Sequence, residues 1–155
     1  MSRHRPTEEP FRWKGVSVHA YKEEDDEHFF AGITRQTLFD GEDADPCELR
    51  YFEIEPGGYS SLERHEHVHQ VIVLRGRGLV LVDPKVTEIG AHDAIRVPSG
   101  TWHQFYASED EPLGFLCMVE ADRDRPEYPN SEQIEELCAR IDTVPPPLKR
   151  ATVRS

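Results

Sequence analysis

Residues 62–74 read LERHEHVHQVIVL, and this stretch decides how the rest of the chain is interpreted. Side chains that can bind a metal ion stand at every second position of its first half: Glu63, His65, His67 and His69. Residues of the same parity share one face of a β-strand. We therefore expect a strand over 63–74 that points all four groups inward, on the face that Val71 and Val73 continue into the core.

Two interpretations of this histidine cluster compete. Histidines on a surface strand would form only a titrating polar patch. Three imidazoles inside the protein would instead carry a large desolvation cost unless a partner compensated for it. A bound metal ion is such a partner, so inward-facing histidines indicate a metal site.

A further histidine follows the turn-forming residues 98–100, where His103 opens the next expected strand. This second motif is a weak signal on its own. Antiparallel pairing could bring it opposite residues 63–74, however, and His103 would then complete a pocket that the first cluster begins. Trp102 and Phe105 flank His103 and are expected to pack in the core or at the rim.

Short apolar runs recur about every 8–12 residues between Gly, Pro and Asp positions, a rhythm typical of an antiparallel sandwich or barrel. Besides 63–74, strands are expected at 16–21, 48–55, 78–82, 94–97, 103–107 and 113–120. A helix should begin with Asn130 or Ser131 as its N-cap, because the apolar residues after it then share one face. The sequence therefore predicts an all-β barrel with a C-terminal helix against its outside.

Length and composition limit the remaining possibilities. The 155 residues suit a single domain, divided into a flexible N-terminal tail at 1–12, a barrel at 13–127, and a helix with a proline-rich tail at 128–155. The formal net charge of −12 argues against nucleic acid or an anionic membrane as a partner. Three widely spaced cysteines, without an apolar leader or membrane-length apolar run, indicate reduced thiols in a cytoplasmic protein.

The stretch from Glu55-Pro56-Gly57-Gly58 to Gly76, followed by residues 90–103, resembles the two sequence motifs of the cupin superfamily. The resemblance implies a cupin jelly-roll β-barrel with a metal ion inside. It departs from the family pattern in the second motif, where His92 stands in place of a glycine and Ala107 in place of an asparagine.

The resemblance also sets the register of the ligands. With Gly58 and Gly76 aligned to the family's first motif, and with the second motif added, the implied metal ligands are Glu63, His65, His69 and His103. The family usually has His first and often Glu third, so the ligand set is kept but permuted. A register starting at His65 and His67 would put the third ligand at Val71 or Ile72, neither of which can coordinate a metal. His67 is therefore expected beside the ligands, as a proton carrier or a supporting group.

Three imidazole nitrogens and one hard carboxylate suit a first-row divalent ion. Mn(II) is the preferred ion because the carboxylate is hard and an octahedral ion would keep positions open for a ligand. Fe(II), Ni(II) or Zn(II) could occupy the same four groups.

Parity also nominates residues for the wall of the pocket. Arg50, Phe52 and Ile54 share one face of their strand, and Cys117 faces the same way from the last strand if the family's arrangement holds. Arg50 could bind a phosphate or carboxylate through its guanidinium fork, or it could pair with one of the many acidic side chains. Cys117 is either a small buried apolar residue or a reactive thiol near the metal.

Longer phrases, such as residues 48–58, 113–119 and 123–126, resemble a narrower bacterial group of manganese cupins that includes methylthioxylulose 5-phosphate methylsulfurylase. This resemblance implies an oxidoreductase that removes a methylthio group from a sugar phosphate, with glutathione or another thiol as acceptor. His67 would move protons, Arg50 would hold the phosphate, and Cys117 would take the methylthio group as a mixed disulfide.

Two other classes of function stay open at this point, because one fold hosts many activities. The first is a metal-dependent Fe(II) dioxygenase, which would consume oxygen. The second is a non-catalytic cupin that binds a small ligand. Small cupins commonly pair barrel to barrel, so the resemblance also implies a homodimer.

Overall fold

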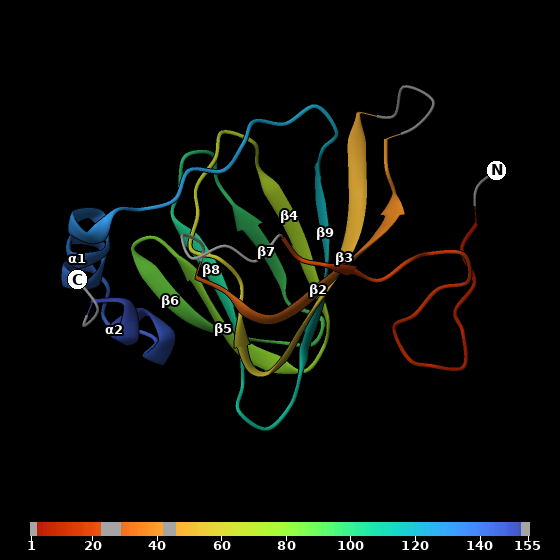
Figure 1. Cartoon of the computed structure of the whole chain (residues 1–155), viewed down its shortest axis with the longest axis horizontal. Coiled ribbons are helices and arrows are strands. Elements are labelled where there is room, and N and C mark those ends of the chain that lie inside the picture. Colours follow the sequence, from red (N-terminus) through yellow and green to blue (C-terminus); the bar gives the residue numbers. More distant parts are fainter. Residues whose placement is uncertain (1–2, 23–28, 42–45, 153–155) are drawn as a thin grey trace.

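The computed structural model describes residues 3–22, 29–41 and 46–152 of the chain. They form one curled sheet of nine strands with two helices packed beside it (Figure 1). The strands are β1 (His19–Ala20), β2 (Ala31–Phe39), β3 (Cys47–Tyr59), β4 (His69–Arg75), β5 (Arg77–Val82), β6 (Lys85–Gly90), β7 (Ala94–Val97), β8 (His103–Ala107) and β9 (Leu113–Glu120). The helices are α1 (Ser131–Arg140) and α2 (Pro146–Thr152). The predicted all-β fold with a C-terminal helix is confirmed.

The strands pair antiparallel in the order β6-β5-β8-β3-β9-β4-β7, and β2 pairs with both β3 and β1. The long strand β3 thereby contacts β2, β8 and β9, and β9 also pairs with β4. Residues far apart in sequence face one another across the inside of the curled sheet. This arrangement brings the start of β4 and the start of β8, which carry two of the histidines, toward a common region.

The inner face of the sheet holds the main core. Phe52, Phe105 and Phe115 stack there, with ring centroids 5.5 Å apart for Phe52–Phe115 and 4.6 Å for Phe105–Phe115. Burial of one such side chain contributes roughly 1.5–3 kcal/mol. The alternation expected for an inner face is clear in β4, where Val71 and Val73 are buried and Gln70 and Ile72 are exposed.

A second core lies outside the sheet, where α1 and α2 cover β5 and β8 (Figure 1). Leu137 of α1 is fully buried in it. Asn130 caps α1 as predicted: its Oδ1 accepts a hydrogen bond from the Gln133 backbone N–H, and Gln133 Oε1 accepts one from the Asn130 N–H. The proline-rich end was expected only as a tail after the helix, but residues 146–152 form α2, and Leu148 packs in this second core because its apolar side chain meets the apolar face of the barrel.

The predicted strand over 63–74 is wrong in its first half. Strand β4 begins at His69, and residues 63–68 are an irregular segment in which only Glu63 and Arg64 form β-bridges, with His103 and Glu127. Glu63, His65 and His67 are nevertheless buried, while Glu66 between them is exposed. Burial alternates here although no continuous ladder forms, because the backbone groups of this segment bond to the first residue of β8, His103, and to residues 100, 124 and 127 outside the strands.

Two strands were missed by the sequence analysis, and the expected strand at 16–21 is reduced to β1. Strand β2 shows no clean alternation because both of its faces are covered. Its outer residue Gln36 is 1% exposed and donates a hydrogen bond from Nε2 to the carbonyl oxygen of Phe11 in the N-terminal segment. Strand β6 is a short hairpin partner of β5 in which only Ile89 is buried, so it gives a weak apolar signal.

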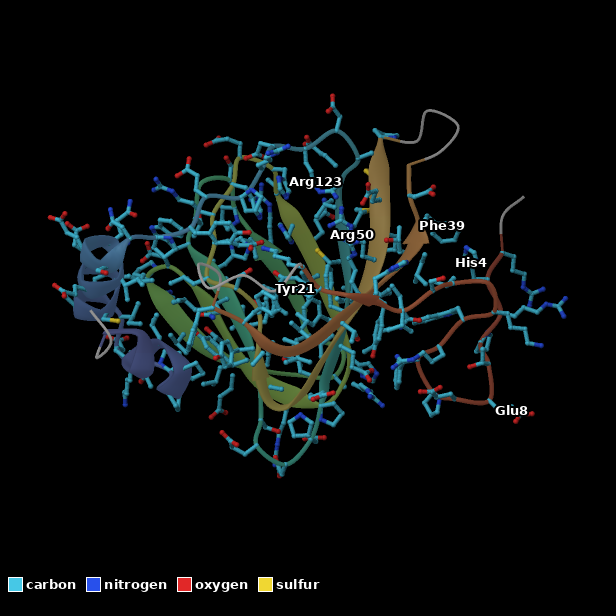
Figure 2. All side chains as sticks on the ribbon, in the orientation of Figure 1. His4, Glu8, Tyr21, Phe39, Arg50 and Arg123 are labelled. Carbon is cyan, nitrogen blue, oxygen red and sulfur yellow. The ribbon has the colours of Figure 1, made fainter. Side chains whose placement is uncertain are left out.

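The N-terminal segment lies along the outer face of β2 and β3. Phe11 and Trp13 pack on the ring of Tyr51, at centroid distances of 5.7 and 5.2 Å, and His4 lies 5.4 Å from Phe39 (Figure 2). Among the residues that the structure describes, no helix has the length and the apolar character that crossing a bilayer requires.

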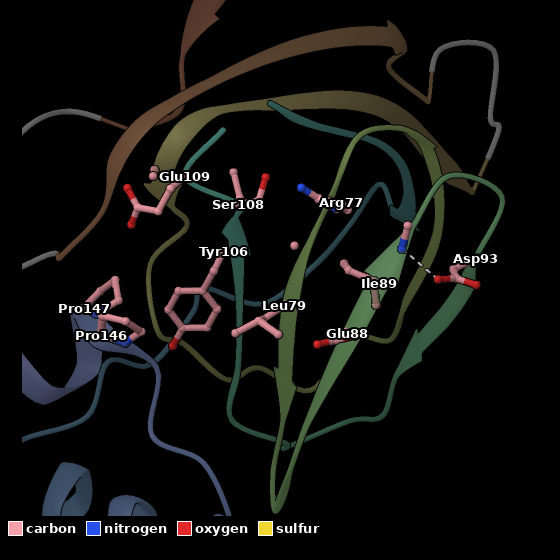
Figure 3. Close-up of a pocket in the computed structure, with 15 residues that line it drawn as sticks. Arg77, Leu79, Glu88, Ile89, Asp93, Tyr106, Ser108, Glu109, Pro146 and Pro147 are labelled. Atoms are coloured by element: carbon pink, nitrogen blue, oxygen red, sulfur yellow. Dashed lines mark hydrogen bonds between the residues drawn. The ribbon is translucent and has the colours of Figure 1, made fainter. Parts of the chain in front are cut away.

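A cleft of about 650 Å³ opens on the outside of the barrel, between β5, β6, β8 and the start of α2 (Figure 3). Its lining includes Arg77, Glu88, Tyr106 and Glu109. No histidine or cysteine contributes to that lining. The chemistry that the sequence predicts therefore belongs elsewhere, inside the barrel.

Candidate metal centre

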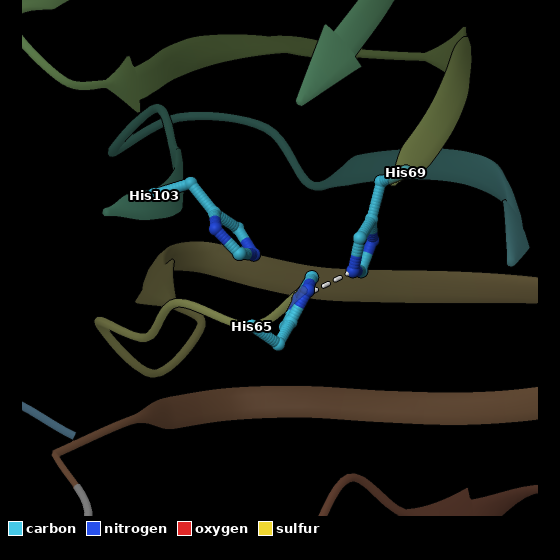
Figure 4. A group of neighbouring side chains, drawn as sticks. All are labelled: His65, His69 and His103. Carbon is cyan, nitrogen blue, oxygen red and sulfur yellow. Dashed lines mark hydrogen bonds between the residues drawn. The ribbon is translucent and has the colours of Figure 1, made fainter. Parts of the chain in front are cut away.

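Three of the four predicted ligands converge inside the barrel. One ligand atom from each of His65, His69 and His103 lies within 4.8 Å of the others, and the Nε2 atoms of His65 and His69 are 2.7 Å apart (Figure 4). Two atoms that each bond one ion at roughly 2.1 Å are at most about 4.2 Å apart. Small ring movements would therefore let all three histidines bind a single divalent ion.

Hydrogen bonds on the opposite ring nitrogen orient two of these histidines. Nδ1 of His65 lies 2.8 Å from the carbonyl oxygen of His67, and Nδ1 of His103 lies 2.9 Å from that of Thr101. A carbonyl oxygen only accepts, so each Nδ1 must carry the proton and donate it. Nε2 is then the unprotonated atom, and it is the atom that a metal ion requires.

His69 is held by a sulfur atom instead. Its Nδ1 lies 3.0 Å from Sγ of Cys117, which is 1% exposed. Burial, followed by the nearby Glu63 carboxylate, raises the pKa of the Cys117 thiol. The structure thus brings Cys117 against a predicted ligand, in a pocket that Glu63 and His103 also line.

Glu63 reaches the same pocket but is not part of the three-histidine group. Its backbone exchanges two hydrogen bonds with His103, of 3.2 and 2.9 Å. Its Oε2 accepts hydrogen bonds from the Lys22 ammonium group and the Ser61 hydroxyl. Burial alone would raise the pKa of this carboxyl, but Lys22, His103 and these hydrogen bonds outweigh burial and lower it. The carboxylate is therefore charged.

Lys22 was missed by the sequence analysis, although it is the cation nearest the predicted carboxylate ligand. Its Nζ also donates to the hydroxyl groups of Ser61, at 2.9 Å, and Tyr128, at 2.8 Å. No local signal could reveal this contact, because Lys22 is 41 residues before Glu63 and lies outside the two motifs.

His67 stacks on His65 with ring centroids 3.6 Å apart and an interplanar angle of 6°. Its Nδ1 lies 2.6 Å from Oδ1 of Asp124, and Asp124 also accepts the backbone N–H groups of Glu66 and His67. These hydrogen bonds overcome the effect of burial and hold the pKa of Asp124 well below its usual range. One atom each of His65, His67 and Asp124 also lie within 4.8 Å of one another. Asp124 is a second residue that the sequence analysis missed.

Arg50 lies on the inner face, as parity predicts, but its guanidinium has a partner. Nε of Arg50 donates to Oε2 of Glu48 at 2.7 Å, and its NH2 group contacts the same oxygen. Arg50 is not among the residues that line the pocket with Glu63, although it is the cross-strand neighbour of Cys117, which is. Both possibilities left open for Arg50 thus remain compatible with its position.

Burial sets the protonation of the histidines and predicts a pH dependence of stability. Burial, followed by His103, lowers the pKa of His65 to about 4 and that of His69 to about 2, and burial also lowers the pKa of His103. The unfolded chain therefore binds more protons below pH 6.5, so stability is greatest above that value and falls as the pH drops. For the metal-free protein we expect a loss on the order of 1 kcal/mol per pH unit for each histidine between pH 6.5 and 5.

Urea unfolding at pH 7.5, 6.5, 5.75 and 5.0 would measure this slope, in a range above the titration of ordinary carboxyl groups. A His65→Gln variant should have a shallower slope than the parent protein. An unchanged free energy of unfolding across this range would show that the imidazoles are hydrated and not buried as described.

Comparisons with known proteins agree on one family. The model of the Cupin domain family matches residues 50–119. The chain is 47% identical over 135 residues to 1-methylthio-D-xylulose 5-phosphate methylsulfurylase of Rhodospirillum rubrum, covering 87% of this chain and 85% of the relative.

Solved structures give the same result. A cupin-2 domain from Rhodospirillum rubrum superposes with a TM-score of 0.78 at 47% identity, covering 87% of this chain and 89% of that one. A cupin 2 conserved barrel domain protein from Rhodopseudomonas palustris has a TM-score of 0.80 at 42% identity, covering 92% and 100%.

Proposed function

Because this chain belongs to the cupin family, we propose that it is a metal-dependent enzyme that removes the methylthio group from a methylthio-ketose phosphate such as 1-methylthioxylulose 5-phosphate. The observation that carries the proposal is the buried Cys117 thiol beside the three converging histidines, in a chain so similar to a methylsulfurylase. A pocket with a metal site and a thiol matches a reaction in which a carbon–sulfur bond is broken.

We propose Glu63, His65, His69 and His103 as the ligands of one divalent ion. Three neutral imidazole nitrogens and a charged carboxylate fit this role, and Mn(II) is preferred over Fe(II), Ni(II) and Zn(II) because of the hard carboxylate. The bound ion would supply Lewis-acid polarisation of the substrate carbonyl. Lys22 would hold one carboxylate oxygen of Glu63 and leave the other to face the ion.

Cys117 is proposed as the group that accepts the sulfur. With Nε2 of His69 bound to the ion, its Nδ1–H would donate a hydrogen bond to Sγ of Cys117 and favour the thiolate despite its burial. The thiolate would attack the sulfur of the methylthio group, so that a disulfide forms and the carbon–sulfur bond breaks. The electron pair of the broken bond would remain on carbon, which is reduced and takes a proton. A thiol such as glutathione would then attack the mixed disulfide, release the Cys117 thiolate and leave as its own methyl disulfide.

His67 is proposed to deliver the proton to carbon. Its Nδ1 is fixed by Asp124, and a histidine whose Nδ1–H is held by a carboxylate exchanges its other proton at Nε2. His67 would therefore act as the acid, with Asp124 keeping its ring oriented. Arg50, next to Cys117 across the strands, is proposed to bind the phosphate group of the substrate.

The partners proposed for this chain are thus a small phosphorylated substrate and glutathione or a related thiol. We also propose a homodimer and a cytoplasmic location. Phe39 and Ile72, exposed by 39% and 43%, leave apolar surface on the outside of the sheet that a second copy would cover. Sedimentation of the purified protein would distinguish a dimer from a monomer.

The proposed activity is tested directly with protein from which bound metal has been removed by a chelator. We expect no turnover of 1-methylthioxylulose 5-phosphate with glutathione until Mn(II) is returned, and then equal amounts of demethylthiolated ketose phosphate and glutathione methyl disulfide. The ion should also raise the melting temperature, since it binds only the folded protein.

Two controls keep this assay specific. Turnover should be the same with and without oxygen, whereas an Fe(II) dioxygenase would stop under anaerobic conditions. Mg(II), which binds oxygen ligands in preference to imidazole, should not restore activity. Full turnover by the protein from which the metal has been removed would contradict the proposal.

A further inference from the structure

Two arginines, Arg35 and Arg50, lie on the inner face of the sheet beyond the lining of the histidine pocket. Arg50 shares the carboxylate of Glu48 with a third, Arg123, which follows β9. We propose that Arg35 joins Arg50 to form the binding site for the substrate phosphate, with Arg123 sharing the acid that neutralises Arg50. This inference deepens the proposed function and rests on it, because it assigns the phosphate of the substrate to particular side chains.

Strand register places Arg35 and Arg50 beside the pocket. Arg35 of β2 pairs with Phe52 of β3, and Arg50 pairs with Cys117 of β9. Phe52 and Cys117 line the pocket that contains Glu63. Arg35 and Arg50 thus lie next to these pocket residues on the same face of the sheet. They are diagonal neighbours on the adjacent strands β2 and β3, a spacing that long side chains can bridge.

Arg50 shares a single acid with another cation. Oε2 of Glu48 contacts Arg50, and Oε1 of Glu48 lies 3.0 Å from NH1 of Arg123. The side chains of Arg50 and Glu48 are only 10% and 16% exposed. In Figure 2, Arg50 and Arg123 lie on the same side of Tyr21, and both contact Glu48. One carboxylate therefore serves two guanidinium groups.

Arg35 lacks an acceptor for a buried donor. Its Nε is buried and has no hydrogen-bond partner. Within the described part of the chain, none of the ion pairs involves Arg35. A buried donor without an acceptor is unfavourable, so a ligand oxygen at this place would be stabilised.

The charge of this group selects an anion. Arg35, Arg50 and Arg123 against Glu48 give 3 − 1 = +2, in a chain whose formal net charge is −12. Guanidinium forks bind phosphate oxygens in pairs, and phosphate supplies several acceptors on one centre. A phosphate monoester bound here would have its sugar carbons directed past Phe52 toward the histidines and Cys117.

The test compares the binding of two sugars: xylulose 5-phosphate, which has no methylthio group, and xylulose, which also lacks the phosphate group. Calorimetry on the Mn(II)-loaded protein should give an affinity for xylulose 5-phosphate that is at least about 30-fold weaker in Arg35→Met and in Arg50→Met. The affinity for xylulose, and for Mn(II), should stay within about threefold of the parent protein. Arg77→Met is the matched control, because Arg77 is exposed and pairs with Asp110 on another side of the barrel, and it should leave both sugars unaffected.

Arg35→Lys provides a second test in case Arg35→Met does not fold. It keeps the positive charge and loses only the paired N–H donors of the guanidinium group. It should show the native circular dichroism spectrum and an intermediate affinity for xylulose 5-phosphate. Unchanged binding of xylulose 5-phosphate in either folded Arg35 variant overturns the inference, as does equal binding of the two sugars by the parent protein.

Failure of this site and failure of the proposed function give different results. If the parent protein binds xylulose 5-phosphate through Arg35 but leaves 1-methylthioxylulose 5-phosphate intact, the phosphate site stands and the reaction is wrong. If the protein turns over that substrate and Arg35→Met has the same KM, the reaction stands and the phosphate site is wrong.

Discussion

Replacement of His69 by alanine is expected to lower the affinity for Mn(II) by at least about 100-fold and the turnover by roughly 1000-fold. His69 lies between the two other parts of the site, since its Nε2 is 2.7 Å from Nε2 of His65 and its Nδ1 is 3.0 Å from Sγ of Cys117. Its removal would leave two imidazoles and one carboxylate that Lys22 already holds. Metal content after dialysis, a competition titration with a coloured chelator, and kcat would measure these effects.

His92 provides the matched control for this variant. It is an exposed turn residue with a φ of 79°, and His92→Asn keeps a residue that tolerates this left-handed backbone. We expect His92→Asn to retain one equivalent of Mn(II) and the parent kcat. A His69→Ala protein that also keeps one tightly bound ion and full turnover would remove His69 from the metal site.

Replacement of Cys117 by serine is expected to reduce kcat by at least about 100-fold while the affinity for Mn(II) changes less than about fivefold. Serine is only slightly smaller than cysteine, and its hydroxyl group can still form a hydrogen bond with Nδ1 of His69. The ring of His69 should therefore keep its orientation. An alcohol cannot form the proposed disulfide, however. The parent protein should be mixed with 1-methylthioxylulose 5-phosphate and quenched before any external thiol is added. Mass spectrometry should then show a methylthio group on Cys117 and on no other cysteine.

Cys138→Ser is the control for the cysteine variant, because Cys138 lies on α1 beside the outer core and away from the histidines. It should keep full activity. If Cys117→Ser also keeps full activity, the covalent sulfur step is wrong, and the methylthio group must pass directly to the external thiol.

Several elements were predictable because their signals are local. Strands β7, β8 and β9 begin and end where the apolar runs predict, and Asn130 caps α1 through contacts within three residues of itself. In each case neighbouring residues determine the element. Strand β2 was not predictable in this way, since its outer face is covered by a segment about 25 residues earlier and its alternation is hidden.

The histidine segment is an intermediate case. Parity over 63–69 led to the expectation that Glu63, His65 and His67 turn inward, and all three are buried, yet the regular strand begins only at His69. The segment 63–68 is held by bonds to distant loops, for example from the Gly100 N–H to the carbonyl oxygen of His65. An alternating pattern of buried residues can thus arise without a ladder.

The amino-acid sequence by itself determined the class of fold, the family, and which residue types meet in the interior, because periodicity and motif spacing are properties of short stretches. Only the tertiary structure decided which groups surround them. Lys22 reaches Glu63 across 41 residues, Asp124 reaches His67 across 57, and Arg35 lies against Phe52 through strand pairing. Such contacts form only when the sheet curls and brings distant segments together, so no local pattern encodes them.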